Sequence, residues 1–187
     1  MMADPAPLPT IVVLASGSGT NLQALIDASR ERDFPGEILA VGCNRPGAFA
    51  LERAAQANIK TFVVDHKKYG SREEFDGALM AELRRLNPDV IILAGFMRIL
   101  TADFVRAFRG RMLNIHPSLL PAYTGLNTHQ RVLDAGDKVH GVSIHFVTEE
   151  LDGGPVIAQA EVAVQSDDDA ESLAERVQQQ EHVLYPI

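Results

Sequence analysis

Short apolar runs alternate with amphipathic segments through the first half of the chain. Four runs are apolar and rich in β-branched side chains, which predicts strands at residues 11–15, 38–43, 61–64 and 90–94. Between them, apolar side chains recur every three or four positions, which predicts helices at residues 20–29, 49–57 and 72–87. Strands that alternate with helices form a parallel sheet. We therefore expect a three-layer, Rossmann-like α/β fold: a mostly parallel twisted sheet with helices on both faces and ligands at the carboxyl ends of its strands.

The second half of the chain has a different pattern. Three further strands are predicted at residues 113–116, 139–147 and 156–164, and two helices at residues 128–135 and 167–184. The last helix has three aspartates at its start, where the helix dipole favours negative charge. A turn around Asp152 joins the last two strands.

Length and composition narrow the class of protein. We expect the 187 residues to form one domain over residues 10–187, after a disordered tail at residues 1–9. The net charge of −8 argues against a nucleic-acid partner. Cys43 is the sole cysteine, and no apolar run resembles a signal peptide or membrane span, so a cytoplasmic location is expected. The chain stops at Ile187, directly after the last predicted helix, so we expect a C-terminal continuation to be missing.

A glycine loop follows the first predicted strand. Gly17 and Gly19 stand between that strand and a helix, where backbone N–H groups can hold a phosphate. A dinucleotide motif needs a third glycine where this chain has Leu22, and no P-loop lysine follows. A phosphate monoester therefore fits better than a dinucleotide or ATP. The alternative is a tight turn without a ligand.

Asn114, His116 and Asp152 are the candidate catalytic set. Asn114 and His116 end a predicted strand, and alternation along a strand points both side chains to the same side. An amide can donate to an oxyanion, an imidazole can carry a proton, and a carboxylate beside that imidazole favours its protonated form. Taken singly, each residue has an ordinary structural role, so the hypothesis depends on the three lying together.

Other polar residues carry weaker hypotheses. His140 and His145 are five positions apart on one predicted strand and should face opposite sides, which makes a metal pair unfavourable. No metal is expected. His129 and His182 lie on predicted helices and are expected at the surface. The segment around Arg98 is either a plain connection or an apolar slot for a flat heterocycle.

Five sequence segments together resemble a known family. They are SGSGTNLQ (16–23), AGFMRIL (94–100), NIHPSLLP (114–121), GLNTH (125–129) and ELDGGPVI (150–157). In these segments and their spacing, from about Ile11 to the last residues, the chain is similar to the phosphoribosylglycinamide formyltransferases, folate-dependent enzymes of purine synthesis. Three positions depart from the pattern expected for that family: Ala122, Thr124 and Asn127.

The resemblance implies a reaction and a set of site residues. A glycinamide amine would attack the formyl carbon of 10-formyltetrahydrofolate, with Asn114, His116 and Asp152 as catalytic residues. The substrate phosphate would lie on Gly19, Thr20 and Asn21, and its ribose on Glu181. The co-substrate would contact Arg72, Met97, Arg98, Ile99, Leu100, Asn114, Thr148, Glu149, Glu150, Leu151 and Asp152.

Two other readings stay open. A formyltetrahydrofolate deformylase or a methionyl-tRNA formyltransferase would share the HPSLLP and LDGGP segments, although the tRNA enzyme should be basic and carry an added domain. A catalytically silent phosphate- or folate-binding module is the third hypothesis. We expect small-molecule partners and no membrane; the sequence does not fix the oligomeric state, and a homodimer is one option.

Overall fold

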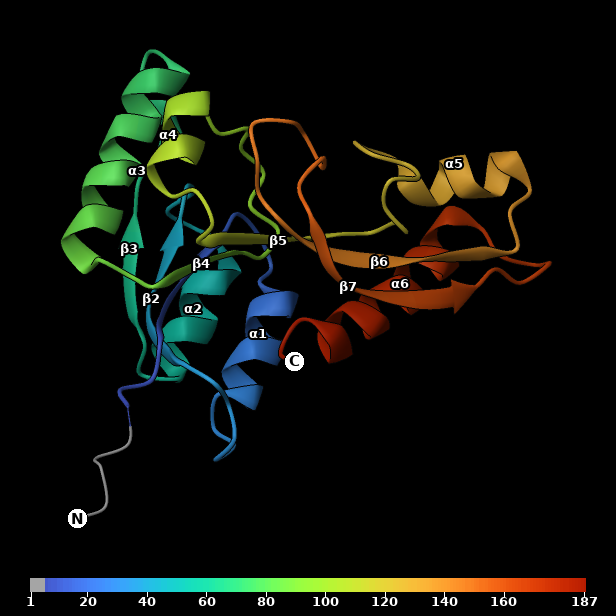
Figure 1. Ribbon diagram of the computed structural model, residues 1–187, viewed down its shortest axis with the longest axis horizontal. Helices are drawn as coiled ribbons and strands as arrows, with labels where there is room; N and C mark the ends of the chain where they lie inside the picture. Colours follow the sequence, from blue (N-terminus) through green and yellow to red (C-terminus); the bar gives the residue numbers. More distant parts are fainter. Residues whose placement is uncertain (1–5) are drawn as a thin grey trace.

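Seven strands form one sheet in the computed structural model, which describes residues 6–187 (Figure 1). The strands are β1 (Thr10–Ala15), β2 (Glu37–Cys43), β3 (Lys60–Val63), β4 (Val90–Leu93), β5 (Met112–His116), β6 (Val139–Phe146) and β7 (Val156–Ala163). The helices are α1 (Thr20–Ala28), α2 (Phe49–Gln56), α3 (Arg72–Leu86), α4 (Ala102–Ala107), α5 (Thr128–Ala135) and α6 (Ala170–Leu184), with a 3₁₀ turn, η1 (His66–Lys68).

The strand order is β3-β2-β1-β4-β5-β6-β7. The pairs from β3 to β5 are parallel, whereas β6 pairs antiparallel with both β5 and β7. This confirms the predicted α/β fold with a mostly parallel sheet. Because β1 to β5 run the same way, their carboxyl ends meet at one edge, and the loops that follow them lie along it in sheet order.

Alternation along β1 divides the interior into two cores. Ile11, Val13 and Ala15 belong to one core, which α1, α2, α5 and α6 cover. Val12 and Leu14 belong to the other, which α3 and α4 cover. A strand that is buried on both faces has to be apolar, and β1 is apolar from Ile11 to Ala15. The helices on both faces fix the sheet, and the sheet fixes the positions of the loops at its edge.

The structure differs from the sequence-based expectation at a few places. Helix α4 and the turn η1 were not predicted, because each is too short to show a helical period. Helix α6 begins at Ala170 rather than at residue 167, because the Asp169 side chain accepts from the backbone N–H of Ser172 and caps the helix. Of the predicted tail, residues 1–5 lie outside the described residues, and residues 6–9 are exposed without regular structure. Within residues 6–187 no helix is long and apolar enough to cross a membrane.

Candidate active site

Strands β5 and β6 bring the predicted catalytic residues together. In the antiparallel ladder Asn114 lies opposite His145, and His116 lies opposite Ser143. Asn114 and His116 are two positions apart on β5, so their side chains leave the same face of the strand. The turn between β6 and β7 then places Asp152 beside both histidines.

His116 lies between two acceptors. Its Nδ1 is 3.5 Å from Asp152 Oδ2, and its Nε2 donates to the carbonyl oxygen of Tyr123 at 2.8 Å. The His116 and Asp152 side chains are only 8% and 7% exposed, so little water screens the carboxylate from the ring. The ring is therefore in contact with the carboxylate on one side and bonded to the main chain on the other. The geometry thus meets the condition on which the catalytic hypothesis depends.

His145 is a member of this cluster that sequence reasoning missed. Its Nδ1 donates to the Phe146 carbonyl oxygen at 3.0 Å, so its Nε2 is free to accept from Asn114 Nδ2 at 3.3 Å. Burial lowers the pKa of His145 and thereby favours the neutral ring that can accept this bond. The Asn114 amide is oriented by one of its N–H groups and keeps the other for a ligand. The sequence shows a histidine on the strand after Asn114, but its position opposite Asn114 follows only from the register in which β5 pairs with β6.

The turn that carries Asp152 has a strained backbone. Asp152 adopts φ 52°, in the left-handed region, and its Oδ2 accepts from the backbone N–H of Gly125 at 2.8 Å. A Cβ atom on Gly154 would overlap the carbonyl oxygen of Phe146, so only glycine fits there. The Leu-Asp-Gly-Gly sequence therefore lets the turn fold back onto β6 and aim the carboxylate at His116.

Buried hydroxyl groups hold the loop between β5 and α5. Ser143 Oγ donates to the Ser118 carbonyl oxygen at 2.7 Å and accepts from Leu120 N at 3.0 Å. Ser118 Oγ donates to the Ala122 carbonyl oxygen at 2.6 Å. These bonds fix the chain just before Tyr123, whose carbonyl oxygen accepts a hydrogen bond from His116 Nε2. All three departures noted above lie in this loop: the Ala122 carbonyl oxygen accepts from Ser118, the Thr124 carbonyl oxygen accepts from Arg131, and Asn127 is the N-cap residue of α5 in a left-handed conformation.

The glycine loop and helix α6 bring the predicted substrate residues together. Gly19 is the N-cap of α1 with φ 73°, and a Cβ there would lie 2.8 Å from Ala50 of α2. Asn21 Nδ2 donates to Glu181 Oε2 at 3.0 Å, and burial raises the pKa of Glu181. Asn21 Oδ1 is buried and has no hydrogen-bond partner within residues 6–187, which leaves an acceptor for a ligand.

Helix α6 contributes one further residue that the sequence did not single out. Gln178 Nε2 donates to Thr20 Oγ1 at 3.1 Å, one turn before Glu181. The helix is anchored by the Tyr185 hydroxyl, which donates to the Leu93 carbonyl oxygen at 2.7 Å. Since Leu93 ends β4, this bond ties the α6 side of the site to the edge of the sheet where ligands bind.

Most of the predicted co-substrate residues lie on two loops, residues 97–100 after β4 and residues 148–152 after β6; Arg72 begins α3 and Asn114 lies on β5. Met97 and Ile99 on one loop, and Leu151 on the other, expose 68%, 60% and 62% of their surface. Helix α4 connects the loops, because Arg106 makes a bidentate pair with Glu149 at 2.8 and 3.0 Å. Exposed apolar side chains on linked loops are suited to a flat ring.

The remaining co-substrate residues are less closely grouped. Arg98 lies over the Phe75 ring at 5.3 Å, whereas Leu100 packs partly into the core under α3 and α4. The Thr148 hydroxyl bonds to the Glu150 carbonyl oxygen at 3.3 Å. Arg72 is the exposed first residue of α3, and the described part of the chain gives it no hydrogen bond to either loop.

Two of the other histidines are not at the surface, where the sequence suggested them. His129 is partly buried rather than a surface residue, and its Nδ1 is 3.1 Å from His140 Nε2. His182 is also partly buried. Among residues 6–187, no group of three or more histidine, cysteine and carboxylate side chains could hold a metal ion.

Comparison with known proteins agrees with this geometry. The chain matches the formyl transferase family over residues 10–187. It is 53% identical over 177 residues to the phosphoribosylglycinamide formyltransferase of Escherichia coli strain K12, covering 95% of this chain and 84% of that protein. It is 45% identical over 176 residues to the human trifunctional purine biosynthetic protein adenosine-3, covering 94% of this chain and 17% of that protein.

Solved structures give the same result. A phosphoribosylglycinamide formyltransferase from Brucella melitensis has a TM-score of 0.91 at 48% identity, covering 96% of this chain and 92% of that one. Glycinamide ribonucleotide transformylase 1 from Symbiobacterium toebii has a TM-score of 0.95 at 43% identity, covering 100% of this chain and 88% of that one. The resemblance seen in the sequence is confirmed, and the chain belongs to the formyl transferase family.

Proposed function

We propose that this chain transfers a formyl group from 10-formyltetrahydrofolate to the amine of phosphoribosylglycinamide in purine biosynthesis. The observation that carries the proposal is the buried contact between His116 Nδ1 and Asp152 Oδ2, 3.5 Å apart, next to the oriented amide of Asn114. The Escherichia coli relative at 53% identity is named phosphoribosylglycinamide formyltransferase, which supports the same activity.

In the proposed reaction the protein places the two reactants and stabilises the charge that develops on the formyl oxygen. The substrate amine attacks the formyl carbon, and the formyl oxygen becomes an oxyanion. Asn114 donates to that oxygen through the N–H group that His145 leaves free, and the His116 imidazolium adds a positive charge. The amine loses one proton and the departing folate nitrogen gains one, so His116 and water near Asp152 only relay protons.

Substrate binding is assigned to the α1 and α6 side of the site. The N-terminus of α1, at Gly19, Thr20 and Asn21, offers backbone N–H groups and a positive dipole end to the phosphate. Glu181, held by Asn21 at 3.0 Å, would accept from the ribose hydroxyls. Co-substrate binding is assigned to Met97, Ile99 and Leu151, whose exposed apolar side chains suit an aromatic ring system.

Product formation with and without the nucleotide tests the proposal. Purified protein is incubated with 10-formyltetrahydrofolate, with or without phosphoribosylglycinamide, and release of tetrahydrofolate is followed. Release only in the presence of the nucleotide is the expected result. Release without it would instead indicate a deformylase, and no release in either case would indicate a silent binding module. A His116→Ala variant measured in parallel should lose the nucleotide-dependent release.

A further inference from the structure

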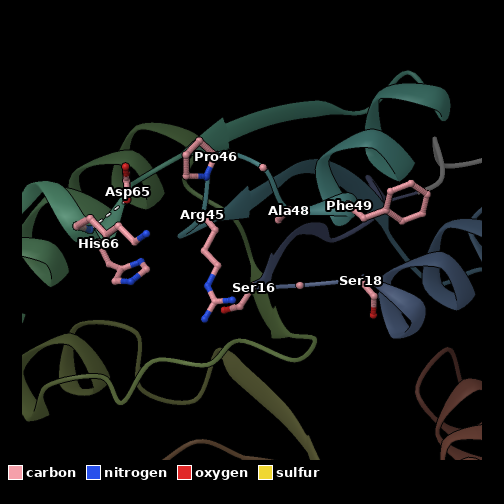
Figure 2. A pocket seen from close by; sticks show the side chains of 11 residues that line it. Ser16, Ser18, Arg45, Pro46, Ala48, Phe49, Asp65 and His66 are labelled. Carbon is pink, nitrogen blue, oxygen red and sulfur yellow. Dashed lines mark hydrogen bonds between the residues drawn. The ribbon is translucent and has the colours of Figure 1, made fainter.

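The loops at the carboxyl edge of the sheet are held to different degrees. The loops after β1, β2 and β3 surround an open cleft of about 760 Å³, and Arg45 reaches into it toward Ser16 (Figure 2). The loop after β5, residues 117–127, is instead bonded along both of its sides. One side meets the catalytic residues and the other meets helix α5. The bonds to α5 have no part in the proposed reaction, so their purpose needs an explanation.

The inner side of this loop contacts both members of the catalytic pair. The Tyr123 carbonyl oxygen accepts from His116 Nε2 at 2.8 Å. Two residues on, the backbone N–H of Gly125 donates to Asp152 Oδ2 at 2.8 Å, and this oxygen lies 3.5 Å from His116 Nδ1. The loop therefore holds the imidazole at one point and the carboxylate at another, so the distance between the two depends on where residues 123–125 lie.

The outer side of the loop is bonded to Arg131 of α5. Its Nη1 donates to the carbonyl oxygen of Thr124 at 2.6 Å and to that of Leu126 at 3.3 Å. These two residues alternate with Tyr123 and Gly125, so inward and outward bonds alternate along the loop. One guanidinium thus fixes the carbonyl groups on either side of the Gly125 residue that faces the catalytic pair.

The Tyr123 side chain is held as well. Its hydroxyl donates to Asp137 Oδ2, in the turn between α5 and β6, and Cζ of Arg131 lies 5.3 Å from the centre of its ring. The bond to Asp137 raises the pKa of Tyr123, so the hydroxyl stays protonated and continues to donate. These contacts fix the position of the residue whose carbonyl oxygen meets His116.

The backbone of the loop needs such external contacts. Tyr123 and Asn127 adopt φ 54° and 55°, in the left-handed region that side chains other than glycine rarely enter. A conformation of this kind persists where the surrounding structure imposes it. Helix α5 can impose it because the helix is itself fixed: Val132 is fully buried in the core, and the Thr128 hydroxyl donates to the Pro117 carbonyl oxygen at 2.6 Å.

We propose that Arg131, Tyr123 and Asp137 are positioning residues of the proposed reaction. They hold the outer side of the loop and thereby set the distance between the His116 ring and the Asp152 carboxylate. The inference rests on the proposed function, which gives that pair its catalytic role. The alternative is that the three residues only stabilise the fold, so the test has to separate positioning from stability.

The first test removes the bonds from Arg131. Arg131→Met keeps an unbranched side chain but cannot donate to the two carbonyl oxygens. A misplaced catalytic group lowers the rate rather than the affinity, so kcat per folded molecule should fall about 10–100-fold while the KM values of both substrates change little. Arg131→Lys keeps a charged donor and should recover part of the rate. Gln130→Ala removes a neighbouring side chain that bonds to Asp134, and as the matched control it should leave kcat unchanged.

A second substitution tests whether Arg131 acts through the catalytic pair. In an Asp152→Asn background the carboxylate that the loop positions is already lost, so Arg131→Met should lower the rate little further. A residue that only stabilises the fold would not show this dependence. Tyr123→Phe removes the bond to Asp137 alone and should lower kcat roughly 2–10-fold.

Two kinetic results would overturn the inference. One is a kcat of Arg131→Met equal to that of the unmodified enzyme. The other is a loss of rate in Arg131→Met that multiplies with the loss in Asp152→Asn, which would mean that Arg131 does not act through the pair.

A measurement without turnover separates the inference from the proposed function. NMR of protein with isotopically labelled histidine follows the His116 Nε2 proton, which is assigned by comparison with His116→Ala. Slow exchange of this proton with water in the unmodified protein and faster exchange in Arg131→Met support the inference even if the catalytic assay fails. Equal exchange in the two proteins overturns it, whereas absence of turnover in the unmodified protein contradicts the proposed function alone.

Discussion

The parallel and antiparallel parts of the sheet bury different kinds of side chain. In the parallel part, β1 is apolar from Ile11 to Ala15, and Val12, Val13 and Leu14 are fully buried. The antiparallel part instead buries polar side chains in the same kind of position, among them His140, Ser143 and His145 on β6. A buried polar group has to be hydrogen-bonded, so the antiparallel part needs more hydrogen bonds to fold. Its polar side chains can also take part in catalysis. We therefore expect substitutions in the parallel part to change stability, and substitutions in the antiparallel part to change turnover.

The largest effect should come from the charge of Asp152. Asp152→Asn removes the carboxylate charge from beside His116 but keeps an oxygen that can accept from Gly125 N. A positioned acid contributes about 10²–10⁴ in rate, so kcat should fall by about that factor while phosphate binding stays near normal. Steady-state kinetics measure the fall in kcat, and calorimetry with the ribonucleotide measures whether phosphate binding is kept. An equal loss of rate and binding would show that the residue is structural.

The next largest effect should be a loss of stability caused by a substitution in the core of the parallel part. Leu83 on α3 is fully buried in the core beneath β1. Leu83→Ala should lower the free energy of unfolding by about 2–5 kcal/mol, because it leaves a cavity. Urea denaturation measures this loss. Turnover per folded molecule should be unchanged at a temperature where the variant is folded; a tenfold drop would contradict the division between the two parts.

The same division explains what the sequence could predict. Strands such as β1 and β4, and long helices such as α3, have apolar patterns that identify them without tertiary information. The proximity of Asn114, His116 and Asp152 could be proposed because two of them share a strand. The role of His145 could not, because it depends on the antiparallel register of β5 with β6 and on the irregularity between Ile144 and His145.

A pH effect on stability should come from the buried histidines of the antiparallel part. Burial, helped by repulsion from His129 and His116, lowers the pKa of His140 to about 4. The unfolded chain protonates this ring near pH 6.5, so it binds more protons than the native state between about pH 6.5 and 4. Stability should be complete above that window and fall on acidification, by at most about 1.4 kcal/mol per pH unit for this group.

Denaturation at a series of pH values measures that slope. The control is His140→Gln, which keeps a group able to bond to His129 but cannot titrate. Its unfolding free energy should depend less steeply on pH between about 6.5 and 4. The same slope in both proteins would remove His140 from the explanation.

A smaller effect on rate is expected at His145. His145→Leu removes the acceptor that orients Asn114, and kcat should fall about tenfold with little change in substrate binding. His145→Gln supplies an amide oxygen that can accept the same N–H group and should recover part of the rate. If both variants were equally slow, packing rather than the hydrogen bond would explain the loss.

The most direct test of the account is a double-mutant cycle on His116 and Asp152, using single-turnover rates of formyl transfer with both substrates saturating. If the carboxylate acts by holding the imidazolium 3.5 Å away, removing either residue removes one shared contribution. The variant His116→Ala/Asp152→Asn should then be no slower than the slower single variant. Rate losses that multiply in the double variant would mean that the two residues act independently, which contradicts the account.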